Sequence, residues 1–214
     1  MNPVLLTSAY LPPVQYFSKL YASPCIYMET HEHYVKQTYR NRALIAGPNG
    51  VQALTIPVEH EYSKRPATRD IRLSDHGNWQ HLHRNALQSS YEGSPYFEYY
   101  ADDILPIYDK NHRFLVDFNA DFLLTICDLL NLKPNIVQTE SYADASALGA
   151  DDFRELIRPK ISHSIDETFR CVEYYQVFRQ KQGFLGNLSV IDLLFNMGPE
   201  ARLVLRDSII RSNI

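Results

Sequence analysis

The sequence predicts an α/β fold: a single domain with a mixed, twisted sheet flanked by helices and a helical C-terminal portion. Three observations predict it. Residues 4–28 follow a strand–helix–strand pattern, which favours parallel pairing through a right-handed crossover. Apolar residues recur at helical spacing between Leu115 and Leu132, and again after Ser189. The 214 residues contain no internal repeat and no Gly/Ser-rich linker, so one domain is expected to span residues 1–214.

The first parallel unit is predicted from its apolar runs and its prolines. Residues 4–9 are expected to form a short buried strand, which ends before Pro12-Pro13 because proline suits a turn or the first positions of a helix. Apolar side chains at three- and four-residue steps then indicate a helix over residues 14–21. Residues 25–28 are predicted to form the second strand.

An antiparallel part of the sheet is expected after the turn signal Gly47-Pro48-Asn49-Gly50. Residues 51–58 are predicted to form a strand, because apolar side chains dominate them. Ile71 and Leu73 indicate another short strand, which would pair with it across the polar stretch at residues 59–69. This hairpin-like pair beside the parallel unit would make the sheet mixed.

Helices are predicted to dominate the rest of the chain. Three are expected, at residues 78–91, 95–108 and 115–132. Residues 134–168 are irregular in pattern, except for a short helix that opens at residues 149–152. Residues 172–178 are predicted to form a strand.

The C-terminal portion has clear helix boundaries. Ser189 is expected to cap a helix that is apolar nearly all round and is therefore buried. Gly198 ends it, and Pro199 starts the last helix.

The charge and the cysteine content exclude several classes of protein. A formal net charge of −4 argues against a general affinity for nucleic acid, because phosphate binding needs a basic face. No run of about 20 apolar residues is present, so no membrane span is expected. The three cysteines are too far apart for a zinc knuckle or a disulfide framework, and the N-terminus has no basic, apolar leader. We therefore expect a cytoplasmic protein.

Residues 29–42 are the most polar stretch and carry the first candidate chemistry. His31 and His33 would project the same way from an extended chain, as a two-histidine metal site requires. His81 and His83 repeat this spacing, but residues two apart on a helix diverge by roughly 200°. Because no third ligand is specified by spacing, ordinary hydrogen-bonding histidines are favoured and no metal site is predicted.

A compact cationic cluster, Lys36, Arg40 and Arg42, lies in the same stretch of this acidic chain. One interpretation is a solvated surface charge run. The other is recognition of a carboxylate or phosphate, which guanidinium groups bind in bidentate fashion. Three interleaved polar side chains favour the second, because they could orient a ligand through directed hydrogen bonds: Thr38, Tyr39 and Asn41.

Nucleophilic catalysis has little support, since the chain has no G-x-S-x-G elbow and no glycine-rich phosphate loop. Cys25 lies in an apolar strand, where a thiol usually serves as inert packing. Asp102 and Asp103 are adjacent on a predicted helix, so their carboxylates point apart. His31 is the best candidate general acid or base, because histidine titrates near neutrality, and His83 is the second.

Seven segments of the chain resemble, in order, successive blocks of the WbqC-like protein family, and together they span nearly the whole chain. They are residues 10–17 (YLPPVQYF), 36–42 (KQTYRNR), 54–58 (LTIPV), 78–79 (NW), 95–97 (PYF), 117–119 (DFN) and 188–200 (LSVIDLLFNMGPE). The ordered set makes the resemblance fairly specific.

The resemblance implies a role in making or modifying bacterial surface polysaccharide, such as O-antigen. It suggests a transferase that acts on an activated sugar or acyl group, with a nucleotide-sugar or acyl donor as the small-molecule partner. The alternative is a non-catalytic protein that binds a carbohydrate or a partner subunit. Whether the chain is an enzyme stays open, and no cofactor follows from the sequence.

Candidate binding residues come from three of these blocks. Ligands of α/β sheets lie beyond the carboxyl ends of strands, which indicates the residues after the first strand: Tyr10, Gln15 and Tyr16. The second block suits a nucleotide-sugar diphosphate or a carboxylate: Lys36, Thr38, Tyr39, Asn41 and Arg42. A later block adds Asn78 and Trp79. The function then requires the loop after the second strand to fold back, so that its polar groups converge on a hollow beside Tyr10 and Gln15.

Overall fold

The computed structural model describes residues 1–59 and 65–210, and its N-terminal unit is the expected strand–helix–strand. β1 (Val4–Thr7) is followed by α1 (Val14–Ala22) and β2 (Ile26–Glu29), and the two strands pair in parallel. Every residue of β1 is buried, which explains its continuous rather than alternating apolar sequence. The predicted parallel unit is confirmed.

Two short strands extend this unit into a four-stranded sheet in the order β7-β2-β1-β8, in which every pair is parallel. They are β7 (Ile136–Gln138) and β8 (Asp151–Asp152). The prediction of a short helix opening at residues 149–152 is therefore wrong. The backbone amides of Asp151 and Phe153 donate to carbonyls at the edge of β1, so pairing with an open strand edge overrides the local pattern.

A separate antiparallel hairpin joins β3 (Arg42–Gly47) to β4 (Gly50–Thr55). The predicted turn lies between them, and Gly50 has a φ of 114°, a conformation that favours glycine. The sequence did not indicate β3, because this strand begins inside the cationic stretch. Its partner β4 corresponds to the strand predicted at residues 51–58.

A second antiparallel pair, β5 (Val58–Glu59) with β6 (Arg72–Leu73), lies where the hairpin-like pair was expected, but only Val58 of the strand predicted at residues 51–58 takes part in it, because β4 pairs with β3. Residues 60–64 of the polar stretch between them lie outside the described residues. The predicted α/β class is confirmed, but the antiparallel strands form two small sheets of their own and do not make the parallel sheet mixed.

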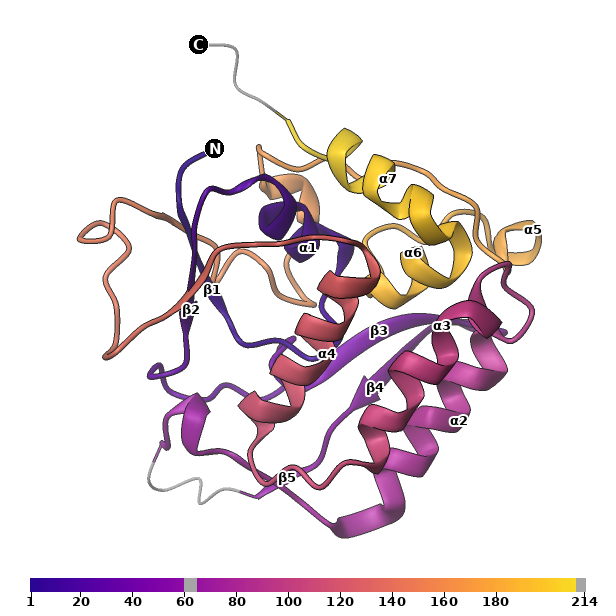
Figure 1. Ribbon diagram of the computed structural model, residues 1–214, viewed down its shortest axis with the longest axis horizontal. Helices are drawn as coiled ribbons and strands as arrows, with labels where there is room; N and C mark the ends of the chain where they lie inside the picture. The colour runs from indigo at the N-terminus through magenta and orange to yellow at the C-terminus, as the bar shows by residue number, and fades with distance from the viewer. Residues whose placement is uncertain (60–64, 211–214) are drawn as a thin grey trace.

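Three helices cover the middle of the chain: α2 (Trp79–Tyr91), α3 (Phe97–Ile104) and α4 (Leu115–Leu129). Figure 1 shows α4 between the parallel strands on one side and the α2–α3 pair on the other. The predicted helical face of α4 is confirmed, since Phe118, Phe122 and Ile126 are almost fully buried. These aromatic and aliphatic side chains form much of the core.

The C-terminal segment differs from expectation at one place. Residues 172–178 form no strand, because Tyr174 and Gln176 turn inward to hydrogen-bond Asp192. The helices that follow are α5 (Arg179–Gln182), α6 (Val190–Met197) and α7 (Ala201–Asp207).

The predicted boundaries of α6 are confirmed. The Ser189 hydroxyl caps it by accepting from the Ile191 amide at 3.3 Å, and Gly198 ends it. Both α6 and α7 pack against α1 (Figure 1). Within the described residues, no helix is long and apolar enough to cross a membrane.

Candidate functional site at the carboxyl edge of the parallel sheet

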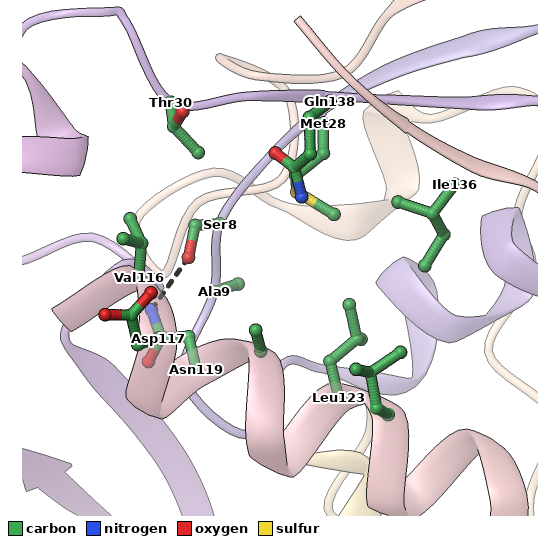
Figure 2. Close-up of a pocket in the computed structure, with 12 residues that line it drawn as sticks. Ser8, Ala9, Met28, Thr30, Val116, Asp117, Asn119, Leu123, Ile136 and Gln138 are labelled. Atoms are coloured by element: carbon green, nitrogen blue, oxygen red, sulfur yellow. Dashed lines mark hydrogen bonds between the residues drawn. The ribbon is translucent and has the colours of Figure 1, made fainter. Parts of the chain in front are cut away.

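A pocket of about 370 Å³ lies where β1, β2 and β7 end beside α4 (Figure 2). Parallel strands end at the same edge, so residues far apart in the sequence meet there. Ser8 follows β1, Thr30 follows β2, and Gln138 is the last residue of β7. We call this cavity the strand-end pocket.

The strand-end pocket is held open by a hydrogen bond from α4 to the end of β1. Asn119 Nδ2 donates to Ser8 Oγ at 3.0 Å, drawn as the dashed line in Figure 2, and to the Arg40 carbonyl at 2.8 Å. Asn119 is only 1% exposed, so these bonds form in a low-dielectric interior. They fix the N-terminal half of α4 relative to the strand ends.

Apolar and uncharged polar side chains share the wall of the strand-end pocket. Figure 2 shows Met28 and Gln138 facing Leu123 and Asn119 across the cavity, with Ile136 at one end. The charged side chain at this pocket, Asp117, is exposed. An apolar cleft with a few fixed polar groups is the usual form of a small-molecule site.

A second and larger hollow, of about 660 Å³, lies where β2 and β8 end; we call it the charged hollow. Successive side chains of a strand point to opposite faces, and Met28 lines the strand-end pocket while Glu29 points to the other face. The Glu29 carboxylate accepts from the amides of His31 at 2.6 Å and Ala143 at 2.7 Å. It thereby ties together the two segments that form the hollow.

Two ion pairs line the charged hollow: a buried one between Arg40 and Glu32, and one between the buried Arg154 and Asp152, whose side chain is 37% exposed. Arg40 contacts Glu32 Oε1 through Nη2 at 2.6 Å and Nε at 2.8 Å. Arg154 binds both carboxylate oxygens of Asp152, with Nη2 at 2.6 Å from Oδ2 and Nε at 3.0 Å from Oδ1. Burial raises the pKa of Glu32, against the opposing effect of Arg40. The hydrogen bonds from Arg154 outweigh burial at Asp152 and lower its pKa.

Both histidines of the polar stretch line the charged hollow, and hydrogen bonds engage both ring nitrogens of His31 and one of His33. His31 Nε2 lies 2.9 Å from the Thr139 carbonyl, which makes this nitrogen the donor and Nδ1 the acceptor that faces Arg69 Nη1 at 3.4 Å. His33 Nδ1 lies 2.7 Å from a backbone carbonyl. Among the described residues, no group of three histidine, cysteine, aspartate or glutamate side chains could hold a metal ion.

Comparison with known proteins relates this chain to one protein family. The family model described as "WbqC-like protein family" matches residues 7–204 of this chain. The chain belongs to the WbqC-like protein family. It is also similar to a Mycobacterium tuberculosis (strain ATCC 25618 / H37Rv) protein described as "Uncharacterized protein Rv1507c", with 25% identity over 223 residues, 94% of this chain and 96% of that protein. No solved structure matches it significantly.

The cationic cluster of this WbqC-like protein does not converge on one site. Lys36 is exposed, and Arg40 is buried in its pair with Glu32. Arg42 opens β3, where its Nε donates to Thr55 Oγ1 of the neighbouring strand at 3.2 Å. Because the chain turns into the β3–β4 hairpin here, successive basic side chains leave in different directions.

The polar residues interleaved with the cluster are buried and shape the loop from within. Thr38 accepts from Arg40 Nη1 at 3.1 Å, and Asn41 Nδ2 donates to the Ile56 carbonyl at 2.9 Å. Burial raises the pKa of Tyr39 to about 12, so its hydroxyl stays protonated. Ligand binding by these residues stays a prediction.

The candidates after β1 lie in the core of the WbqC-like protein. The Tyr16 hydroxyl donates to the Thr7 carbonyl at 2.8 Å. Gln15 Nε2 donates to Asp166 at 2.9 Å. Tyr10 is fully buried, and its hydroxyl lies 2.9 Å from His83 Nδ1.

The candidates on and just before α2 also lie in different surroundings, some buried and one exposed. Trp79 is buried against His83, and its Nε1 donates to the Ser74 carbonyl at 2.9 Å. Asn78 is exposed and holds the left-handed position before α2. Burial lowers the pKa of His83 to about 4, so its imidazole is neutral near neutral pH. A catalytic role for His83 stays a prediction that requires a ligand to reach the core.

The expected hollow beside Tyr10 and Gln15 is therefore not found, because both side chains are used inside the core. The strand-end rule selected Tyr10 and Gln15, whereas Ser8 and Thr30 are the residues at this edge that line a pocket. No local pattern singled out Arg154 or its partner Asp152, because that segment showed no periodicity and their place at the charged hollow depends on the pairing of β8 with β1.

Proposed function

We propose that this WbqC-like protein is a transferase that holds an activated sugar or acyl group in the strand-end pocket, in the synthesis of bacterial surface polysaccharide. The observation that carries the proposal is the position of a cavity of about 370 Å³ at the carboxyl edge of parallel strands. Small-molecule sites of α/β proteins occur at this edge and occupy roughly 300–1,000 Å³. The polysaccharide role is what the family resemblance implies.

The position of His31 next to Thr30 supports its role as general base in this proposal. Thr30 lines the strand-end pocket, and the next residue, His31, lines the charged hollow. With Nε2 donating to Thr139, Nδ1 holds the lone pair that would take a proton from an acceptor hydroxyl. Arg69 contacts this nitrogen at 3.4 Å and would move aside as the acceptor enters.

We also place the protein in the cytoplasm, where the donor would be bound. The three cysteines, Cys25, Cys127 and Cys171, are all free thiols, which supports a reducing compartment. Anion recognition by Lys36 and Arg42 remains part of the proposal for a nucleotide-sugar donor, with the charged phosphates outside the pocket.

A pocket-filling substitution tests the proposal. Ala120 lines the strand-end pocket, so Ala120→Leu should occupy the space of the donor's transferred group. Ala53→Leu makes the same change on an exposed position of β4 and serves as the matched control. Thermal unfolding would be measured with uridine diphosphate glucose, uridine diphosphate N-acetylglucosamine and acetyl-coenzyme A.

A ligand present at about 100 times its Kd stabilises the folded state by about 2.7 kcal/mol. We expect one donor to raise the melting temperature of the wild type and of Ala53→Leu, and to leave Ala120→Leu unchanged. If Ala120→Leu responds as the wild type does to every donor, the strand-end pocket is not the site.

A non-catalytic binding protein is the second candidate, and the engagement of both ring nitrogens of His31 favours it. The variant His31→Asn separates the two candidates. Under the transferase proposal this variant still binds the donor but loses turnover. Under the binding proposal the wild type has no turnover to lose, and only ligand affinity changes.

A further inference from the structure

The arginines of the charged hollow do not form an anion site, because carboxylates already neutralise them. Arg40 is neutralised by Glu32, and Arg154 by Asp152. Glu155, also at this hollow, pairs with Arg158. A phosphate or carboxylate entering here would have to displace a carboxylate that already contacts each guanidinium, so the hollow holds no uncompensated positive charge on its arginines.

Paired charges nevertheless leave hydrogen-bonding capacity toward the cavity. Arg40 contacts Glu32 through Oε1 alone, and Oε2 has no hydrogen bond among the described residues. Arg154 spends two N–H groups on Asp152 and one on the Ala143 carbonyl at 3.2 Å, out of the five that a guanidinium carries. The remaining N–H groups of Arg154 can donate, and Glu32 Oε2 can accept. Together they match a hydroxyl, which both donates and accepts hydrogen bonds.

An exposed aromatic ring stands at the rim of the hollow. Tyr142 is 64% exposed, yet the Arg154 guanidinium carbon lies 5.0 Å from its ring centroid and holds the ring in place. The ring therefore offers a flat apolar surface beside the paired ions. The face of a sugar ring that carries C–H groups is also flat and apolar, whereas its hydroxyls project sideways.

The hollow is built before any ligand arrives. Glu29 is fully buried and holds the amides of His31 and Ala143, one from each segment that forms the hollow. A preformed cavity spares a ligand the cost of ordering the loops around it.

We infer that the charged hollow binds an uncharged sugar residue, which stacks on Tyr142 and hydrogen-bonds to Glu32, Asp152 and Arg154. The inference rests on the proposed function, because the sugar is the polyhydroxyl part of the donor or the acceptor of that transferase. The two cavities, one on each face of β2, would then have different roles. The strand-end pocket would hold the activated group, and the charged hollow would hold the sugar residue.

Saturation-transfer NMR on the full chain tests the inference, with methyl glucoside and N-acetylglucosamine as neutral probes and inorganic pyrophosphate as the anionic probe. Tyr142→Ala removes the platform, and Tyr142→Phe keeps the ring. Tyr99→Ala removes a tyrosine that is 80% exposed on α3 and is the matched control. We expect a sugar to bind the wild type, Tyr142→Phe and Tyr99→Ala, and to bind Tyr142→Ala about tenfold more weakly.

Asp152→Asn tests the charge argument directly. It removes the carboxylate that hydrogen-bonds to Arg154 and, among the described residues, leaves only Glu29, whose Oε2 lies 3.9 Å from Nη1, so sugar binding should weaken and salt-sensitive binding of pyrophosphate should appear. The inference is overturned if no neutral sugar binds the wild type, if the wild type prefers pyrophosphate, or if Tyr142→Ala and Tyr99→Ala bind sugar equally well.

The Ala120→Leu variant distinguishes this inference from the proposed function. A sugar signal that survives in Ala120→Leu and is lost in Tyr142→Ala supports the charged hollow, whatever the donors do at the strand-end pocket. A sugar signal that is lost in Ala120→Leu and survives in Tyr142→Ala places the sugar in the strand-end pocket. That result overturns the inference and leaves the proposed function standing.

Discussion

Asp192 on α6 gives a pH-dependent stability that can be worked out from its surroundings. Its carboxylate is fully buried and accepts from the hydroxyls of Tyr91 at 3.0 Å and Tyr174 at 2.7 Å, and from Gln176 Nε2 at 2.8 Å. Burial raises the pKa of Asp192 from 3.8 to about 6, because these three neutral hydrogen bonds only partly replace lost hydration. Asp192→Asn removes the ionisable group and keeps the shape of the side chain.

The sign and the size of the effect follow from linkage. Between about pH 4 and pH 6 the folded state binds the Asp192 proton more tightly than the unfolded chain does, so the free energy of unfolding falls as the pH rises through this range. The full contribution is present below the unfolded pKa of 3.8 and is lost above the folded pKa of about 6. At about 1.4 kcal/mol per pKa unit, this difference amounts to about 3 kcal/mol.

Urea unfolding from about pH 4 to about pH 7 measures this effect in the wild type, in Asp192→Asn and in Asp103→Asn. Asp103 is exposed on α3 and controls for the loss of one carboxylate. As the pH rises, the free energy of unfolding of the wild type should fall, relative to that of Asp192→Asn, by most of the difference of about 3 kcal/mol. Asp103→Asn should follow the wild type. A stability difference between wild type and Asp192→Asn that is constant, or that grows in favour of the wild type with pH, would refute the reasoning.

Three further predictions concern buried groups. Lys19→Met leaves the buried carboxylate of Asp166, 2.6 Å from Lys19 Nζ, without its cation; urea unfolding should show a loss of about 3–5 kcal/mol, and a loss below about 1 kcal/mol would contradict it. Gly198→Ala should destabilise by about 1–3 kcal/mol, because φ is 53° and a Cβ would lie 2.5 Å from the Tyr96 ring; an unchanged melting temperature would count against this close contact. The NMR signals of the His83 ring should not titrate above about pH 5, since burial lowers its pKa to about 4, and a midpoint near neutrality would show that the ring is hydrated.

The carboxyl edge of the sheet shows where sequence reasoning succeeds and where it stops. The strand-end rule pointed to the residues after β1, and a pocket lined by Ser8 and Thr30 lies at this edge of the sheet. The same rule selected Tyr10 and Gln15, which the core absorbs, since a sequence does not show on which side of a turn the chain re-enters the interior.

Contiguous residues by themselves determined the β1–α1–β2 unit, the apolar face of α4 and the capped, buried α6. Each depends on periodicity, prolines or capping side chains within a few residues, and these act locally through sterics and hydrogen bonds. The tertiary structure alone decided that residues 151–152 become a strand, because the open edge of β1 supplies the hydrogen bonds. It also decided that Arg40, which the sequence placed in a cationic cluster, is buried, because a guanidinium in the interior needs a carboxylate within reach and Glu32 supplies it.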